Sequence, residues 1–220
     1  MSDSFEKQAA LAAASILLET NSVHFSPDEP FTFTSGRKSP VYIDCRRLIS
    51  FPRARAKLMD LGAEMITRRI GYESLDAIAG GETAGIPFAA WIAERLALPM
   101  LYIRKKPKGF GRMAQIEGEM KEGARVLLVE DLASEGTSKI NFVNAIRAAG
   151  GEIAHTFVVF HYGIFPSSVE SLAAEGVLLH GLTTWHDVLA LAHERGSFTA
   201  PQYQAIKSFL DDPEGWKAPA

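Results

Sequence analysis

The stretch VLLVEDLASEGTSK, from Val126 to Lys139, places chemically capable residues at the end of an apolar run. The run predicts a buried strand over 125–130, and in an open α/β sheet ligands bind beyond the carboxyl ends of such strands. We therefore expect the carboxylates of Glu130 and Asp131 to emerge in a ligand crevice. The vicinal hydroxyls of a sugar, or a divalent cation, would relieve the repulsion between them.

Small and hydroxyl-bearing residues follow the two acids, ahead of a helix predicted over 138–149. Small residues let main-chain N–H groups approach an anion closely, and a helix N-terminus adds partial positive charge. A diol on one side and a phosphate on the other describe a ribose 5-phosphate. The alternative for the segment alone is a capped turn, with Thr137 or Ser138 as the N-cap. Glu135 fits a phosphate loop only with its carboxylate turned outward.

A second segment, KKPKGFGRMAQIEGEMKEGA over 105–124, is rich in charge and glycine and poor in large apolar groups. A loop of this length inside a compact domain is usually functional or mobile. The alternative is a solvated run of charges.

Strands and helices alternate along most of the chain, which predicts a parallel sheet covered on both faces. The predicted strands are 75–80, 99–104, 125–130, 152–160 and a possible fifth at 176–182, and the predicted helices between and after them are 86–98, 138–149 and 187–196. Before them come a helix at 4–20, extended segments at 31–35 and 40–44 around a turn at 36–39, and a helix at 53–70. We expect residues 1–70 to form an N-terminal piece and residues 71–220 the core of a single compact unit.

Composition excludes several classes of protein. The 220 residues hold 23 Lys and Arg against 26 Asp and Glu, a formal net charge of −3, so nothing favours nucleic-acid or membrane-surface binding. The single cysteine, Cys45, has no internal disulfide partner, which favours the cytoplasm, and we expect a half-buried small residue rather than a catalytic thiol. No apolar run reaches the length of a membrane span.

Four segments together resemble a known family. VLLVEDLASEGTS is similar to the phosphoribosyl-pyrophosphate (PRPP) signature of the type I phosphoribosyltransferases. GGETAGIPFA at 80–89 resembles the pyrophosphate-binding loop of the orotate phosphoribosyltransferases, YIRKKPKGFG at 102–111 their mobile lid, and FTFTSGRKSPVYID at 31–44 their N-terminal hood. The resemblance covers most of residues 31–150 and weakens beyond Val159.

The resemblance implies the type I phosphoribosyltransferase fold, a mostly parallel sheet flanked by helices with an N-terminal hood. It implies transfer of the phosphoribosyl group of PRPP to orotate, giving orotidine 5-phosphate and pyrophosphate in pyrimidine biosynthesis. The implied cofactor is Mg²⁺, held mainly through PRPP with Glu130 and Asp131 as candidate protein ligands, and the implied assembly is a homodimer whose lid reaches the neighbouring subunit.

The resemblance also implies roles for individual residues. The catalytic candidates are Arg104, Lys105, Lys108 and Asp131. The candidates for PRPP binding are Arg104, Lys105, Lys108, Glu82, Thr83, Glu130, Asp131, Leu132, Ala133, Ser134, Glu135, Gly136, Thr137 and Ser138. The candidates for orotate binding are Ser134, Tyr42, Thr34 and Lys38.

Departures from the family pattern leave the base less certain than the class of enzyme. Many members carry lysine at the positions of Thr34 and Ala84 and histidine at that of Phe110. Members often place an arginine after the fourth strand to meet the orotate carboxylate, whereas residues 158–168 contain none and offer only His161. The alternatives are a transferase for another base and a non-catalytic, nucleotide-binding regulator of the same fold.

Overall fold

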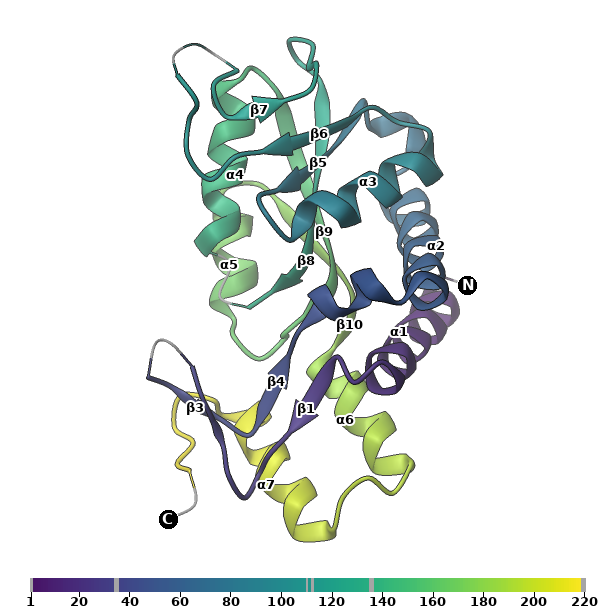
Figure 1. The fold of residues 1–220 in the computed structure, drawn as a ribbon, viewed down its shortest axis with the longest axis vertical. Helices are drawn as coiled ribbons and strands as arrows, with labels where there is room; N and C mark the ends of the chain where they lie inside the picture. The colour runs from purple at the N-terminus through teal and green to yellow at the C-terminus, as the bar shows by residue number, and fades with distance from the viewer. Residues whose placement is uncertain (1, 34–35, 110, 112, 135–136, 219–220) are drawn as a thin grey trace.

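A six-stranded sheet forms the centre of the molecule in the computed structural model, which describes residues 2–33, 36–109, 111, 113–134 and 137–218 (Figure 1). The strand order is β10 (Leu178–Thr184), β9 (Glu152–His161), β8 (Arg125–Ala133), β5 (Ala77–Gly81), β6 (Met100–Ile103) and β7 (Ile116–Glu117). All neighbours run parallel except β7, which is antiparallel to β6. The predicted α/β class and mostly parallel sheet are confirmed, including the possible fifth strand as β10.

The strands are apolar on both faces because helices cover both. Leu127 and Val129 of β8 pack into one hydrophobic cluster, and Val126 and Leu128 pack into a second on the opposite face. Helices α1 (Ser2–Glu19), α2 (Pro52–Arg69), α3 (Gly85–Leu96), α6 (Trp185–Glu194) and α7 (Ala200–Asp211) contribute to the first cluster, and α4 (Thr137–Ala148) and α5 (Ser167–Ala174) to the second. Sequence patterns did not predict α5, α7 or β7.

The hood consists of two short antiparallel ladders rather than the one hairpin expected. Strand β1 (Val23–Phe25) pairs with β4 (Val41–Ile43), and β2 (Phe31–Thr32) pairs with β3 (Lys38–Ser39). The predicted turn at 36–39 is therefore partly wrong, because its last two residues belong to a strand. The chain then enters a 3₁₀ helix, η1 (Cys45–Ser50), and a second one, η2 (Tyr72–Ser74), precedes β5.

Residues 1–70 share a core with the rest of the chain. Leu17 of α1 and Leu58 of α2 are fully buried in the cluster that also holds Phe157 of β9 and Trp185 of α6. The division of the chain at residue 70 stays a prediction. No helix within the described residues is both long and apolar enough to cross a membrane.

Candidate active site

The sheet has a topological switch point between β5 and β8. These two strands are neighbours, yet α3 packs from β5 onto one face through Phe88, whereas α4 packs from β8 onto the other through Phe142. At such a point the helices diverge and leave a crevice at the carboxyl ends of the strands, where ligands bind. Candidate residues that are far apart in the sequence meet there, because Glu82 follows β5, Lys105 follows β6 and Asp131 lies near the end of β8.

The two acids lie inside β8, not beyond it. The strand continues to Ala133 because Glu130 pairs with Val158 and Leu132 with Phe160 on β9. The predicted end at residue 130 was therefore three residues too early. Since side chains alternate along a strand, Glu130 and Asp131 leave β8 on opposite faces of the sheet, although the charge of Asp131 still acts on Glu130. Their shared role toward a ligand stays a prediction.

Glu130 is held beneath the loop that follows β5. A Cβ atom at Gly81 or at Gly85 would collide with its Oε1 atom, so only glycine permits this approach. The side chain is 8% exposed, and Oε1 has no hydrogen-bond partner among the described residues. Burial raises the pKa of the Glu130 carboxyl to about 8; the positive charge of Lys139 opposes that rise and the negative charge of Asp131 adds to it.

Asp131 faces the hood side of the sheet. Its Oδ1 atom accepts a hydrogen bond from the main-chain N–H of Leu132 at 2.9 Å. Burial raises the pKa of the carboxyl, while the nearby charges of Lys139 and Arg46 lower it. Cys45, whose thiol is affected by the charge of Asp131, is fully buried rather than half-buried as expected. Burial and the charge of Asp131 both raise the pKa of this thiol well above the usual range. A thiol held protonated in this way is a structural residue, not a nucleophile.

Lys139, in the first turn of α4, is a buried cation that the sequence analysis did not select. It is 3% exposed, and its Nζ atom donates to the main-chain carbonyl of Leu132 at 2.7 Å. Burial lowers the pKa of the ammonium, and the charges of Glu130 and Asp131 raise it. The only sequence signal was its position as the last residue of the 126–139 stretch.

The predicted phosphate loop is described in part. Leu132 and Ala133 end β8, Ser134 is half-buried, and α4 begins at Thr137, as the pattern of a strand, a short loop and a helix predicts. Glu135 and Gly136 lie outside the described residues, as do the side chains of Thr137 and Ser138. The contacts of this loop with a phosphate stay predictions.

The pyrophosphate loop and the base of the lid are joined. The main-chain N–H of Lys105 donates to Oε2 of Glu82 at 2.8 Å, and the Glu82–Thr83 peptide bond is cis. Arg104 places Nη1 3.4 Å from Oε1 of Glu117, and its Nε is buried without a hydrogen-bond partner among the described residues.

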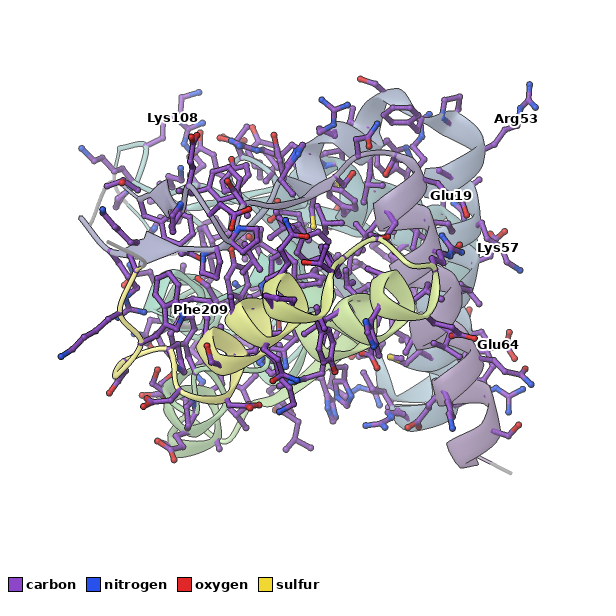
Figure 2. All side chains as sticks on the ribbon, turned by 90° about the horizontal axis from the view of Figure 1, so that it is seen from below. Glu19, Arg53, Lys57, Glu64, Lys108 and Phe209 are labelled. Atoms are coloured by element: carbon purple, nitrogen blue, oxygen red, sulfur yellow. The ribbon has the colours of Figure 1, made fainter. Side chains whose placement is uncertain are left out.

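The lid is more regular than a long loop. Its stem is antiparallel through β7 and through bonds from Arg104 N–H to Gln115 O at 2.8 Å and from Lys108 N–H to Ala114 O at 2.7 Å. The Lys108 side chain is exposed and extends from the periphery in Figure 2. In Figure 1 the segment between β6 and β7 lies at the upper left and the hairpin of β3 lies on the same side of the molecule, below the middle.

The hood supplies an aromatic surface. The half-buried ring of Tyr42 contacts the rings of His24, Phe31 and Phe33 at centroid distances of 6.1, 5.7 and 6.3 Å. These side chains and Thr32 line a hollow of about 390 Å³. Lys38 is exposed on β3, and Thr34 lies outside the described residues.

His161, the last residue of β9, has a structural role. The cation that lies near the loop after β9 is Arg37. The Ser168 hydroxyl donates to Phe165 O at 2.8 Å, so the contact of 3.0 Å between His161 Nε2 and Ser168 Oγ places the imidazole N–H as donor. The guanidinium of Arg37, from the hood, lies 4.9 Å from the centre of the Phe165 ring. The sequence pattern did not indicate Arg37, because the arginine was expected after the fourth strand, in residues 158–168, whereas Arg37 precedes the first strand of the six-stranded sheet.

Comparisons with known proteins agree with this geometry. Residues 54–171 match the model of the phosphoribosyl transferase domain. The orotate phosphoribosyltransferase of Dinoroseobacter shibae is 59% identical over 98% of this chain and 96% of its own. Among solved structures, the orotate phosphoribosyltransferase of Aeropyrum pernix is 31% identical with a TM-score of 0.70, over 84% of this chain and 99% of its own.

A third comparison concerns the substrate. The orotate phosphoribosyltransferase of Mycobacterium tuberculosis in complex with 5-phospho-alpha-D-ribosyl 1-diphosphate (PRPP) is 25% identical, with a TM-score of 0.61, over 80% of this chain and 98% of its own. A domain match over more than half of the chain, together with relatives of high identity over nearly its whole length, shows the family. The chain belongs to the type I phosphoribosyltransferases and, within them, to the orotate phosphoribosyltransferases.

Proposed function

We propose that the transfer of the phosphoribosyl group from PRPP to orotate takes place in the crevice between β5 and β8, with Asp131 on the ribose hydroxyls. The observation that carries this proposal is the convergence, at one edge of the sheet, of Asp131 from β8, Glu82 from the loop after β5 and Lys105 from the base of the lid. Asp131 would meet the ribose hydroxyls, Glu82 would hold the loop proposed for pyrophosphate, and Lys105 would meet the pyrophosphate that leaves.

The reaction is a displacement at the anomeric carbon. A ring nitrogen of orotate forms the new bond to this carbon as the bond to the pyrophosphate oxygen breaks, so positive charge develops on the ribose. The carboxylate of Asp131 favours that charge, as does Glu130 when it is ionised, while Arg104, Lys105 and Lys108 favour the negative charge on the departing pyrophosphate. Closure of the lid excludes water, which would otherwise trap the electrophilic sugar.

The donor groups of the crevice fit Mg²⁺. Magnesium is usually bound through one or two carboxylates and the phosphates of its substrate. Glu130 and Asp131 each offer one carboxyl group, on opposite faces of β8, so an ion held mainly by the PRPP phosphates would take one of them as its protein ligand; Oε1 of Glu130 is buried without a hydrogen-bond partner among the described residues. When bound, the ion would neutralise part of the charge on the pyrophosphate.

The base belongs between the hood and the loop that follows β9. Tyr42 offers an aromatic face, and Ser134, Thr34 and Lys38 are the proposed polar contacts to the edges of the ring. The orotate carboxylate requires a cation, and Arg37 is our candidate because its guanidinium already lies over Phe165 in that loop. The planar guanidinium of arginine matches a carboxylate with two parallel hydrogen bonds, which is the reason for this choice.

We further propose a homodimer in the cytoplasm. The family resemblance supports the dimer and a lid that acts on a neighbouring subunit. Mixing Lys108→Ala with Asp131→Asn subunits tests this arrangement, since Lys108 extends outward from the lid and a hybrid dimer with one intact site would regain activity. A monomer in sedimentation analysis, or hybrids without activity, would contradict it. The single, buried Cys45 supports the reducing compartment.

The central experiment measures pyrophosphate release with PRPP and orotate, uracil, hypoxanthine or adenine. Turnover restricted to orotate is the expected result, and turnover of another base instead would replace the base assignment. Asp131→Asn and Lys105→Ala should each lower kcat about 100-fold or more with the fold retained. Lys57→Ala is the matched control, because Lys57 extends into solvent from α2 (Figure 2). Unchanged rates in both site variants would place the chemistry elsewhere, and absence of turnover with every base would favour the non-catalytic regulator.

A further inference from the structure

A buried lysine at the centre of the site has no part in the chemistry described above. The Lys139 side chain is 3% exposed, although a lysine in the first turn of a helix ordinarily extends into solvent. Its described hydrogen bond is the one from Nζ to Leu132 O. An ammonium has three N–H donors, so one neutral carbonyl does not satisfy it.

The surroundings of Lys139 include acidic groups that favour its charged form. Removing an ammonium from water costs several kcal/mol, which only nearby opposite charge and hydrogen bonds offset. The negative groups acting on it are Glu130 and Asp131, which precede its carbonyl partner on β8. His161, at the end of β9, also feels this charge, because Lys139 helps to lower the pKa of its imidazole. The ammonium therefore lies among the carboxyl ends of β8 and β9.

The bond from Lys139 to Leu132 also closes the loop between them. One end of the bond is in β8 and the other in the first turn of α4, so the segment 133–138 is tied at its base. That segment is the proposed 5-phosphate loop. A strand end and a helix start that are held together lose less conformational entropy when a ligand binds between them.

We propose that Lys139 is a positioning residue for the ribose 5-phosphate half of PRPP: its buried ammonium ties the first turn of α4 to the end of β8, on either side of the proposed phosphate loop. The inference rests on the proposed function, because it assigns the diol and the 5-phosphate to this crevice. It goes further by predicting that the two halves of PRPP respond differently to one substitution.

The test compares Lys139→Met, Lys139→Arg and the exposed control Lys57→Met by calorimetric titration with ribose 5-phosphate and, separately, with inorganic pyrophosphate. Lys139→Met should weaken the binding of ribose 5-phosphate by about 10- to 100-fold. Pyrophosphate binding and the KM for orotate should change less than threefold. The KM for PRPP should rise accordingly, while Lys57→Met matches the wild type in every measurement.

The arginine variant separates charge from packing. Methionine is closer to lysine in volume, so a residue that only fills space would tolerate methionine better than arginine. A residue that acts through charge would show the reverse order in ribose 5-phosphate affinity, and this reverse order is the result expected. Equal losses for both ligands, better function in Lys139→Met, or failure of both variants to fold would each overturn the proposal. Absence of orotate turnover by wild-type protein would refute the proposed function instead, because the two binding measurements need no turnover.

Discussion

The carboxylate of Glu82 accepts a hydrogen bond from the main-chain N–H of Lys105 at 2.8 Å, which joins the loop after β5 to the first residues of the lid. The contact places the base of the lid over the loop proposed for pyrophosphate. Lys105 is also among the charges that lower the pKa of Glu130. The Glu82 side chain therefore joins the loop proposed for pyrophosphate to the proposed lid.

Removing this contact should loosen the lid. Glu82→Ala is expected to raise the rate at which trypsin cleaves after Lys105 and Lys108 in unliganded protein several-fold, because the bond contributes about 1–3 kcal/mol. The kcat for orotate should fall about tenfold as closure becomes less favourable. Glu170→Ala, at an exposed position on α5, is the control. Equal cleavage rates in the two variants would show that Glu82 does not hold the lid.

Alanine at Gly81 or Gly85 should disrupt the site through Glu130. A Cβ atom at either position would overlap with Oε1 of Glu130, so the carboxylate or the loop must move. We expect both variants to lose PRPP affinity by at least tenfold and about 1–3 kcal/mol of unfolding free energy, measured by titration and by chemical denaturation.

Gly196→Ala provides the comparison for these two variants. Gly196 has φ +71° and open space around its Cβ position, so alanine there introduces backbone strain alone. It should cost about 1 kcal/mol and leave PRPP affinity unchanged. PRPP affinity retained in Gly81→Ala and Gly85→Ala would show that the packing against Glu130 has no functional importance.

The sequence predicted β8 and its acids well because an apolar run that is buried on both faces is visible locally. The end of the strand was not predictable in the same way. Residues 130–133 include two acids and a small residue, which is the composition of a loop, yet they stay extended because they pair with 158–161 on β9. That pairing depends on residues far along the chain. The same reason hid β1, whose three residues are a strand only through β4.

Lys139 and Arg37 show a related limit for the site. In a helical pattern a lysine indicates the exposed face, and only the position of the β8 carboxyl end shows that this one is buried. Arg37 belongs to a turn that reaches the Phe165 loop only after the chain has folded. The family resemblance, by contrast, selected Glu82, Lys105 and Asp131, which the fold brings to the carboxyl ends of neighbouring strands, because a motif carries information about three-dimensional arrangement that hydrophobic periodicity does not. Their roles stay predictions.

Arg37 should determine affinity for the carboxylate of the base. Arg37→Met is expected to raise the KM for orotate about 10- to 100-fold through the loss of a charge-assisted pair, while the dissociation constant of PRPP stays within threefold of wild type. Arg53→Met, at an exposed position near the start of α2 (Figure 2), is the matched control. A change in PRPP affinity without a change in the KM for orotate would assign Arg37 to another part of the site.

Stability should decline in mild acid because of His180 on β10. Its Nε2 lies 3.1 Å from Nδ1 of His155 on β9, and Arg69 of α2 and Glu6 of α1 are the other charges that act on it. Burial, then His155, then Arg69 lower the pKa of His180 to about 4, while Glu6 raises it. The ordinary pKa of histidine is about 6.5, so between about pH 6.5 and 4 the unfolded chain binds a proton that the folded chain does not.

The free energy of unfolding should therefore fall by about 1–2 kcal/mol between pH 7 and pH 5 from this residue, with no contribution above pH 7. His180→Gln removes the titrating group, so its unfolding free energy, measured by urea denaturation, should depend less on pH over this interval than that of the wild type. The exposed His186→Gln is the control and should keep the wild-type slope. Identical slopes in His180→Gln and the wild type would show that the acid sensitivity arises elsewhere, because the substitution leaves every other titrating group in place.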